Sequence, residues 1–435
     1  MRLFTVTIAL SLFAFACKTP QTTTTTVKEH PLSIQLDTSP ILNQSFTGLA
    51  LWDFSKKEML YERNAHKYFT PASNTKIYTL FSSLSILGDS LPALRYVTRG
   101  DSLIFWGTGD PTFLHPDFKN TRVQDFLIAQ KDKKLFFSSG NFTNQSLGAG
   151  WSWADYNEDY QPELSPLPMF GNIIRTSVTN RKLDVYPVFF RDSLRVAPLS
   201  VDYIEREIYS NYFSVPTSVT QKTNYRQDIP YKTSALLTQK MLADAVKRPV
   251  GLLNIPVAPD AVTLYSMPVE PVYRQMMQIS DNMLAEQLLF VCGAVTKDTI
   301  NSALAINTIK GKYMTELPDF HKWADGSGLS RYNLFTPRNT VKILEKMYGM
   351  IPQEKLFSIF PTGGVGTLSS MFKSDKPFVF AKSGTLSGVY CLSGYLITKQ
   401  GKMLAFSFMN NSYVKPASAI RKEVERILTW VHINY

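Results

Sequence analysis

Cysteine and histidine are scarce in this 435-residue chain, and their scarcity excludes several kinds of protein. Three cysteines are too few for the disulfide framework of a small secreted scaffold, and we read Cys292 and Cys391 as buried free thiols rather than a bridge. The five histidines lie far apart, and none belongs to an HExxH or similar ligand pattern. We therefore expect no metal site.

Dense basic clusters are also missing. The formal net charge is +11, but lysine and arginine are scattered, and no basic cluster is denser than "KDKK" (Lys131 to Lys134). We therefore expect no nucleic-acid partner, and we read the charge as solubility and attraction to acidic polymers. What the chain does have is 44% hydrophobic and 19% charged residues, which indicates a globular protein of two or three domains.

An apolar run from Leu3 to Ala16, preceded by an arginine and followed by Cys17, opens the chain in the layout of a secretory signal. The run is too short to span a bilayer comfortably. The residues that end at Cys17 resemble a bacterial lipobox, so we predict a signal peptide over residues 1–17 and a lipid anchor on Cys17, with simple secretion as the alternative. The polar, threonine-rich residues 18–35 predict a flexible tether.

Strand patterns occur at both ends of the remaining chain. Two strands are expected at about Ser45 to Phe54 and Glu58 to Glu62, and three more between Pro377 and Ser412, with a turn at Lys399 to Gly401. A C-terminal helix follows, with one apolar face formed by Ile420, Val424, Ile427, Leu428 and Val431. These patterns predict an α/β (α+β) fold with a five-stranded antiparallel sheet covered by helices.

The helices that cover this sheet are expected in the middle of the chain. Apolar periodicity predicts them at about Ser73–Ile86, Val272–Ala294, Ile300–Leu317, Pro337–Met347 and Gln353–Phe360. Thr336 is the expected N-cap of the fourth, because Pro337 suits the first helical position.

A different composition separates two parts of this domain. From about Ser102 to Asp228 the chain has few long helical faces and is rich in Tyr, Phe, Trp, Pro and Ser. This change predicts a β-rich insertion over residues 99–255 within a helix-and-sheet domain made of residues 36–98 and 256–435.

Three short motifs hold residues suited to acyl transfer. Ser73 and Lys76 stand at i and i+3, where a neutral lysine amine can take the serine proton. Ser280 would relay a proton, and Asn282 would hold a substrate carbonyl and the lysine. In "KSGT" (Lys382 to Thr385) a cation and a hydroxyl can bind a terminal carboxylate, while the glycine lets a substrate lie along the strand. Taken alone, each serine motif is more often a helix cap.

The order SxxK, SDN, KSG is that of class A β-lactamases and penicillin-binding proteins. From roughly residue 40 to its end, the chain resembles the D-alanyl-D-alanine carboxypeptidase/endopeptidase family, the low-molecular-mass class C penicillin-binding proteins or peptidase family S13. The long gap between the first two motifs fits the insertion that this family carries and class A β-lactamases lack. The resemblance rests on the blocks "PASNTK", "GTGDPTF", "GWSWADY", "SDNMLAEQL", "DGSGLSRYNLFTP", "PTGGVGTL" and "KSGTLSGVYCLSGYL".

The resemblance implies a role for each motif residue. Ser73 would be the nucleophile, Lys76 its general base, and Ser280 and Asn282 the proton relay and substrate clamp. The carboxylate of the substrate would be bound by Lys382 and Ser383, beside Gly384, and the oxyanion by the backbone N–H groups of Ser73 and Thr385. In this family the "DGSGLSRYN" block borders the active site, so the supporting residues would be Asp325, Ser327 and Arg331.

The resemblance also implies a substrate and a location. Peptidoglycan stem peptides would be cut at D-Ala-D-Ala termini or at D-alanyl cross-links, and β-lactams would inhibit as covalent substrate mimics. No cofactor is needed, because Ser, Lys, Asn and backbone donors suffice for acyl transfer. The protein would lie in the cell envelope or periplasm and touch the membrane only through its lipid anchor.

Two alternatives stay open. One is a serine β-lactamase or esterase on the same scaffold, and the other is a non-catalytic peptidoglycan-binding relative. A β-lactamase needs a dedicated deacylating carboxylate, and none is identified: we expect Glu286, one turn past Asn282, on the helix surface. Ser383 stands where the family most often has threonine, which keeps the hydroxyl.

Overall fold

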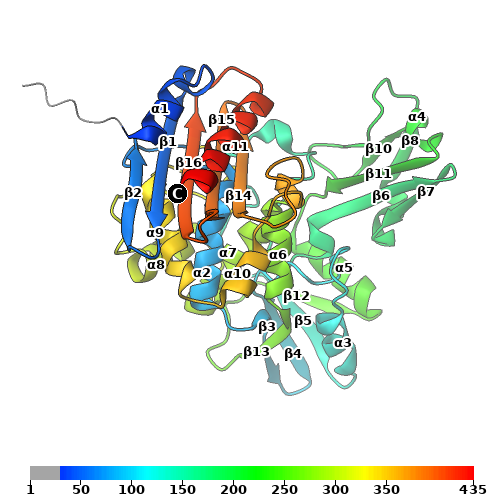
Figure 1. Cartoon of the computed structure of the whole chain (residues 1–435). Coiled ribbons are helices and arrows are strands. Elements are labelled where there is room, and N and C mark those ends of the chain that lie inside the picture. Colours follow the sequence, from blue (N-terminus) through cyan, green and yellow to red (C-terminus); the bar gives the residue numbers. More distant parts are fainter. Residues whose placement is uncertain (1–29) are drawn as a thin grey trace, which may run out of the picture.

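The computed structural model describes residues 30–435, and both ends of this part of the chain form one five-stranded sheet (Figure 1). The strand order is β14-β15-β16-β1-β2, and every neighbouring pair is antiparallel. The predicted sheet and fold class are therefore confirmed. The strands are β1 (Phe46–Asp53), β2 (Glu58–Arg63), β14 (Val379–Leu386), β15 (Val389–Ile397) and β16 (Met403–Asn411).

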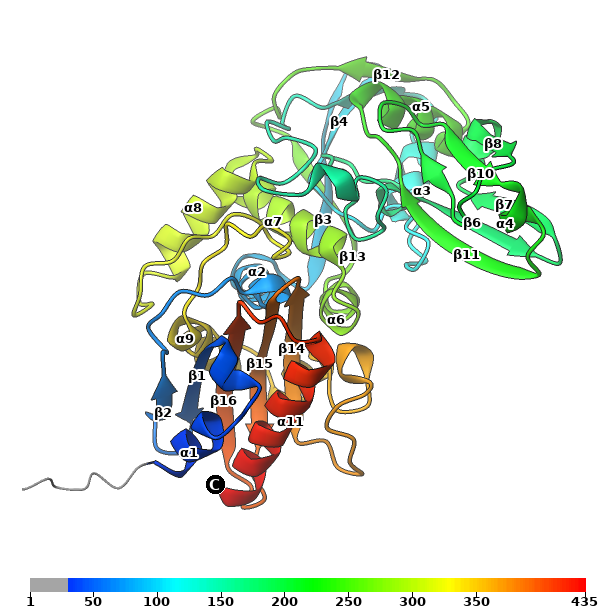
Figure 2. The same cartoon turned by 90° about the horizontal axis from the view of Figure 1, so that it is seen from above.

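Helices cover both faces of this sheet (Figure 2). On one face lie α1 (Pro31–Asp37) and α11 (Ala417–Asn434), whose predicted apolar face is buried. On the other lie α2 (Thr75–Ile86) and α9 (Pro337–Tyr348). The Thr336 hydroxyl accepts the backbone N–H of Asn339 at 3.2 Å, so its prediction as an N-cap is confirmed. Because β15 is buried on both faces, its sequence is almost continuously apolar.

The predicted helix Val272–Ala294 is wrong, because two helices occupy this region. They are α6 (Glu270–Gln278) and α7 (Asn282–Lys297). Between them Ser280 has a left-handed φ of 64°, and the Asp281 carboxylate caps α7 by accepting the N–H of Leu284 at 2.9 Å. The apolar periodicity runs on across this break, which is why the sequence reads as one helix. The helices α8 (Ser302–Tyr313) and α10 (Gln353–Ile359) complete the layer.

A second five-stranded sheet follows α2, in the order β12-β5-β4-β3-β13, with two helices packed on it. The sheet reaches beyond the predicted insertion of 99–255, because β3 begins at Ser90 and pairs with β13, which ends at Pro268. Its elements are β3 (Ser90–Arg99), β4 (Ser102–Gly107), α3 (Arg122–Ala129), β5 (Lys134–Ser138), α5 (Ala235–Val246), β12 (Val250–Leu253) and β13 (Val262–Pro268).

Two small sheets extend from this second sheet, away from the first one (Figure 2). One has the order β11-β6-β7 and the other β8-β10-β9. Both share one apolar core with the second sheet. Their elements are β6 (Ile173–Thr179), β7 (Lys182–Tyr186), β8 (Leu194–Ala197), β9 (Glu205–Arg206), β10 (Phe213–Pro216), α4 (Thr217–Thr220) and β11 (Asn224–Pro230).

Several predictions concern the N-terminal region. The signal peptide, the lipid anchor on Cys17 and most of the tether lie outside the described residues. The prediction of a tether up to residue 35 is wrong at its end, because α1 begins at Pro31 and buries Leu32 and Leu36 in the core beside α11. Within residues 30–435, no helix is both long enough and apolar enough to cross a bilayer. Cys292 and Cys391 are buried free thiols, as expected.

Candidate active site

The three sequence motifs converge on one cavity of ≈ 690 Å³ between the first sheet and residues 90–268, the inserted region, which contains the other three sheets. Ser73, Ser280, Asn282 and Thr385 all line it, and so does Arg331. The inserted region contributes one part of the wall, formed by Gly150, Ser152, Asp155 and Tyr160.

Ser73 lies in a single 3₁₀ turn, Ala72–Asn74, directly before α2. The N-cap position of α2 belongs to Asn74, so the alternative that Ser73 caps this helix is not what the structure shows. The Ser73 hydroxyl is half-buried and accepts a hydrogen bond from Lys76 Nζ at 3.1 Å. Ser73 therefore presents its hydroxyl to the cavity and to a lysine at once.

Lys76 is fully buried beneath the cavity, with three acceptors around its amine. Besides Ser73, Nζ donates to Asn282 Oδ1 at 2.6 Å and to the backbone oxygen of Ser327 at 2.8 Å. Burial lowers the pKa of Lys76 to about 8, although the carboxylates of Glu286, Asp325 and Asp281 act in the opposite direction. The amine is thus partly neutral near neutral pH, the state in which it can accept a proton.

Ser280 and Asn282 are positioned by the break between α6 and α7. Ser280, whose φ is left-handed, directs its hydroxyl to a second buried lysine, Lys382, and Lys382 Nζ donates to Ser280 Oγ at 2.8 Å. The Asn282 amide is held at both ends, because its oxygen accepts from Lys76 and its Nδ2 donates to the backbone oxygen of Tyr160 at 2.9 Å. The SDN motif therefore links both lysines and the inserted region.

The strand β14 carries the third motif along the other side of Ser73. Lys382 is fully buried, and its Nζ also donates to the Ser383 backbone oxygen at 2.7 Å. Burial, and then the charge of Lys76, lower the pKa of Lys382 well below its usual range. Gly384 lies against the Ser73 turn so closely that a Cβ atom there would be 2.8 Å from the Ser73 nitrogen. Thr385, the next residue, is exposed on the cavity wall.

The "DGSGLSRYN" block forms a buried loop behind the lysine, but only part of it reaches the cavity. Asp325 accepts the backbone N–H groups of Gly328 and Ser330 at 2.9 and 2.6 Å, which folds the loop. Ser327 contributes its carbonyl to Lys76. Arg331 is exposed on the cavity wall and donates to the Ser387 backbone oxygen at 3.0 Å. Asp325 and Ser327 thus lie behind Lys76 and do not line the cavity, while Arg331 does.

Sequence reasoning misplaced one residue and missed several contacts. Glu286 is not on the helix surface: it is 1% exposed, and its carboxylate accepts two backbone N–H groups of the "DGSG" loop. Asn74 was missed as a link to β14, since its Nδ2 donates to the Lys382 backbone oxygen at 2.7 Å. Trp151 was missed as a link from the insertion, since its Nε1 donates to Asp325 at 3.0 Å.

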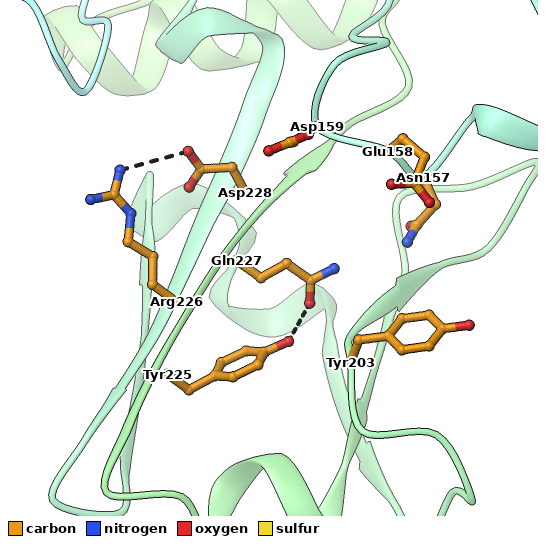
Figure 3. A pocket seen from close by; sticks show the side chains of 8 residues that line it. All are labelled: Asn157, Glu158, Asp159, Tyr203, Tyr225, Arg226, Gln227 and Asp228. Carbon is orange, nitrogen blue, oxygen red and sulfur yellow. Dashed lines mark hydrogen bonds and ion pairs between the residues drawn. The ribbon is translucent and has the colours of Figure 1, made fainter. Parts of the chain in front are cut away.

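A second cavity, of ≈ 670 Å³, lies on the inserted region next to the Tyr160 segment (Figure 3). Its walls carry three acidic side chains and one arginine, but none of the three motif serines and no buried lysine. We therefore place the active site in the cavity of Ser73. The second cavity is lined by Asn157, Glu158, Asp159, Tyr203, Tyr225, Arg226, Gln227 and Asp228.

A sheet covered on both faces, with a Ser-Lys pair at the start of a central helix and a lysine-bearing edge strand beside it, defines the class of penicillin-binding proteins and related β-lactamases. Among residues 30–435, no cluster of three or more His, Cys, Asp or Glu side chains is arranged to hold a metal ion. Within that class, the chain belongs to the D-Ala-D-Ala carboxypeptidase 3 (S13) family, whose model matches residues 30–431.

Named relatives agree with this membership. The chain is 24% identical over 426 residues to D-alanyl-D-alanine carboxypeptidase DacB of Haemophilus influenzae, covering 85% of this chain and 86% of that protein. It is 26% identical over 450 residues to a D-alanyl-D-alanine carboxypeptidase of Actinomadura, covering 87% and 80%. The fold matches the crystal structure of penicillin binding protein 4 from Haemophilus influenzae with a TM-score of 0.74 at 18% identity, over 93% of this chain and 100% of that one.

Proposed function

We propose that the protein is a serine DD-peptidase that cleaves D-alanyl-D-alanine bonds, as a carboxypeptidase, an endopeptidase or both, in peptidoglycan stem peptides. The observation that carries the proposal is the contact of Ser73 Oγ with the buried Lys76 amine at 3.1 Å, inside a cavity that also holds Ser280 and Thr385. Membership of the family and the names of the relatives support the choice of substrate.

In the acylation step, Ser73 Oγ attacks the carbonyl carbon of the penultimate D-alanine. Neutral Lys76 accepts the hydroxyl proton, and the backbone N–H groups of Ser73 and Thr385 bind the oxyanion. The new C–O bond replaces the C–N bond to the leaving residue, whose amine receives a proton through Ser280. Water then hydrolyses the ester and frees Ser73. β-Lactams acylate the same serine, because their ring amide takes the place of the scissile bond.

The other motif residues hold the substrate in place. Lys382 and Ser383 bind the carboxylate of the leaving residue, and Asn282 holds the carbonyl of the peptide. Gly384 lets β14 lie directly against the Ser73 turn, and this close approach supports substrate binding along β14. The role of Arg331 is to line the outer part of the cavity.

The inserted region and the N-terminus complete the proposal. The sheets between Ser90 and Pro268 act as an insertion that brings Asp155 and Tyr160 to the cavity, while the flanking segments form the catalytic domain. The N-terminal signal is cleaved before Cys17, whose lipid anchors the protein in the cell envelope. If Cys17→Ser does not move the protein from the membrane fraction to the soluble fraction, the anchor is elsewhere.

Digestion of purified pentapeptide muropeptides and cross-linked dimers, followed by chromatography, tests the activity. Wild type is expected to release D-alanine or separate dimers, and Ser73→Ala to do neither. Ser85→Ala is a matched control, because Ser85 lies on the same helix and donates only to the Phe81 backbone oxygen at 2.8 Å. An active Ser73→Ala variant, or a wild type inert to all these substrates, contradicts the proposal.

Incubation with a labelled penicillin separates the peptidase from a β-lactamase on the same scaffold. We expect a long-lived adduct on the peptide that contains Ser73, detected by mass spectrometry. Rapid release of hydrolysed penicillin would favour the β-lactamase, and the absence of any adduct would favour a non-catalytic binding protein.

A further inference from the structure

Glu286 is a buried carboxylate that the steps above do not use. It lies in the first half of α7, and 1% of its surface is exposed. Its Oε2 accepts the backbone N–H of Gly326 at 2.9 Å, and its Oε1 accepts that of Ser327 at 2.7 Å. An acidic side chain is rarely buried unless it is paired, and here the partners are two successive backbone N–H groups.

The loop that Glu286 holds is the one that holds Lys76. The carbonyl of Ser327 accepts from Lys76 Nζ at 2.8 Å, and the carbonyl of Gly326 accepts from Thr79 Oγ1 at 2.6 Å. Gly328 is pressed against the Ser73 turn, where an added Cβ would be 1.9 Å from the Ala72 oxygen. The loop therefore fills the space between α7 and α2, and Glu286 fixes the side that faces α7.

Asp325 fixes the other side of the loop and does not replace Glu286. Its oxygens accept from the Gly328 and Ser330 backbone N–H groups and from Asn333 Nδ2 at 2.7 Å. These contacts shape the loop itself, whereas the contacts of Glu286 attach it to α7.

Four ionisable side chains surround the amine of Lys76. Lys382 comes from β14, Asp325 from the buried loop, Asp281 from the cap of α7, and Glu286 from within α7. Among the charges that keep Lys76 protonated, that of Glu286 has the largest effect. Burial, followed by the charge of Asp325, raises the pKa of Glu286 to about 8, whereas hydrogen bonding by the Ser327 side chain and by the two backbone N–H groups acts in the opposite direction. Glu286 therefore ionises over the same pH range in which Lys76 loses its proton.

We propose that Glu286 is a positioning residue for acylation: it holds the Ser327 carbonyl on the Lys76 amine and, in its ionised form, supplies the negative charge that balances that amine. The proposal rests on the proposed function, in which Lys76 is the general base for Ser73. It assigns Glu286 two separable effects, one on the geometry of Lys76 and one on its charge.

The two effects predict two changes in Glu286→Gln. A glutamine amide directs its own N–H groups at one of the two loop N–H groups, so the loop shifts, and the acylation rate at high pH falls by about tenfold. The neutral side chain also removes the attraction that keeps Lys76 protonated. The rise of the acylation rate with pH therefore moves to lower pH, by about one pH unit.

The experiment measures the second-order rate of acylation by a fluorescent penicillin from about pH 5.5 to about pH 9, with folding checked by thermal melting. The matched control is Gln287→Leu, because Gln287 is the next residue, is equally buried and donates to the Gly109 and Ser165 backbone oxygens instead. We expect this control to leave the pH dependence in place. An unchanged rate in Glu286→Gln, or a lower rate with an unmoved pH dependence, overturns the proposal.

Glu286→Asp decides the matter if the glutamine variant does not fold. The shorter carboxylate keeps the charge but cannot reach both N–H groups, so we expect a several-fold lower rate at high pH and an unmoved pH dependence. A wild-type rate, or a moved pH dependence, overturns the proposal. If wild type itself forms no adduct on Ser73, the proposed function fails instead.

Discussion

Replacing Gly384 with alanine forces β14 away from the turn that carries Ser73. A Cβ atom at this position would lie 2.7 Å from the backbone oxygen of Pro71, 2.8 Å from the nitrogen of Ser73 and 3.0 Å from that of Asn74. All three neighbours are backbone atoms, so none can turn aside as a side chain would.

The size of the effect follows from these distances. Ordinary van der Waals contact of a Cβ begins at 3.4 Å, so the backbone must open by about 0.7 Å on the side of Pro71. Overpacking of this kind costs about 1–3 kcal/mol of stability. A displacement approaching 1 Å between Ser73 and the strand that binds the substrate lowers the acylation rate by about 10- to 100-fold.

The assay compares acylation by a fluorescent penicillin and thermal unfolding in Gly384→Ala and in a matched glycine variant. Gly311 serves as the match, because it lies in α8 with no atom within 4 Å of the Cβ position. We expect Gly311→Ala to acylate normally and to be more stable by about 0.5–1 kcal/mol. Gly384→Ala acylating at the wild-type rate would refute the close approach of β14 to the nucleophile.

Three further outcomes are expected. Acylation should rise roughly fifty-fold between pH 6 and pH 8, because the pKa of Lys76 is about 8 and its neutral form is required; a flat profile would contradict this role. Arg421 donates to Thr385 Oγ1 at 3.3 Å, so its positive charge should attract the substrate carboxylate. We therefore expect Arg421→Ala to raise KM by about two- to fivefold and to retain kcat. A lower kcat at unchanged KM would rule out this role of Arg421 in substrate binding. Burial, followed by the charge of Lys310, lowers the pKa of His321 to about 4. The contribution of His321 to the free energy of unfolding, measured in urea, should therefore be full above pH 6.5 and be lost as the pH falls toward 4. His321→Gln should weaken this loss of stability, and an identical loss in the variant would exclude His321 as its source.

The sheet and the convergence of the motifs were predictable, each for its own reason. β15 and β16 are almost continuously apolar, and the turn after Ile397 carries a glycine, so the strands could be read locally. The meeting of Ser73 with the SDN and KSG motifs could not be read from any local pattern. It followed from the order of the motifs in a family, and the structure brings them to one cavity.

The break before α7 shows where two local signals conflicted. Apolar residues continue through Met276 and Met277 to Met283 and Leu284, which favours one helix. Asp281 is a good N-cap, which favours a new helix start. The cap decides the structure, because Ser280 in the left-handed region cannot continue a helix. Periodicity alone therefore hides a break when both helices bury their faces in one core.

The prediction for Glu286 was wrong because a charged residue was expected on the exposed side of its helix, although the apolar residues around it indicate that the helix has no exposed side there. From Met283 to Ala294 every residue of α7 is buried, and a helix that is apolar on all sides lies inside the protein. A carboxylate within such a helix has no solvent to reach, so it must find donors in the fold. The sequence could have required a partner for Glu286, but not which one, because the N–H groups that satisfy it come from a loop 40 residues further along the chain.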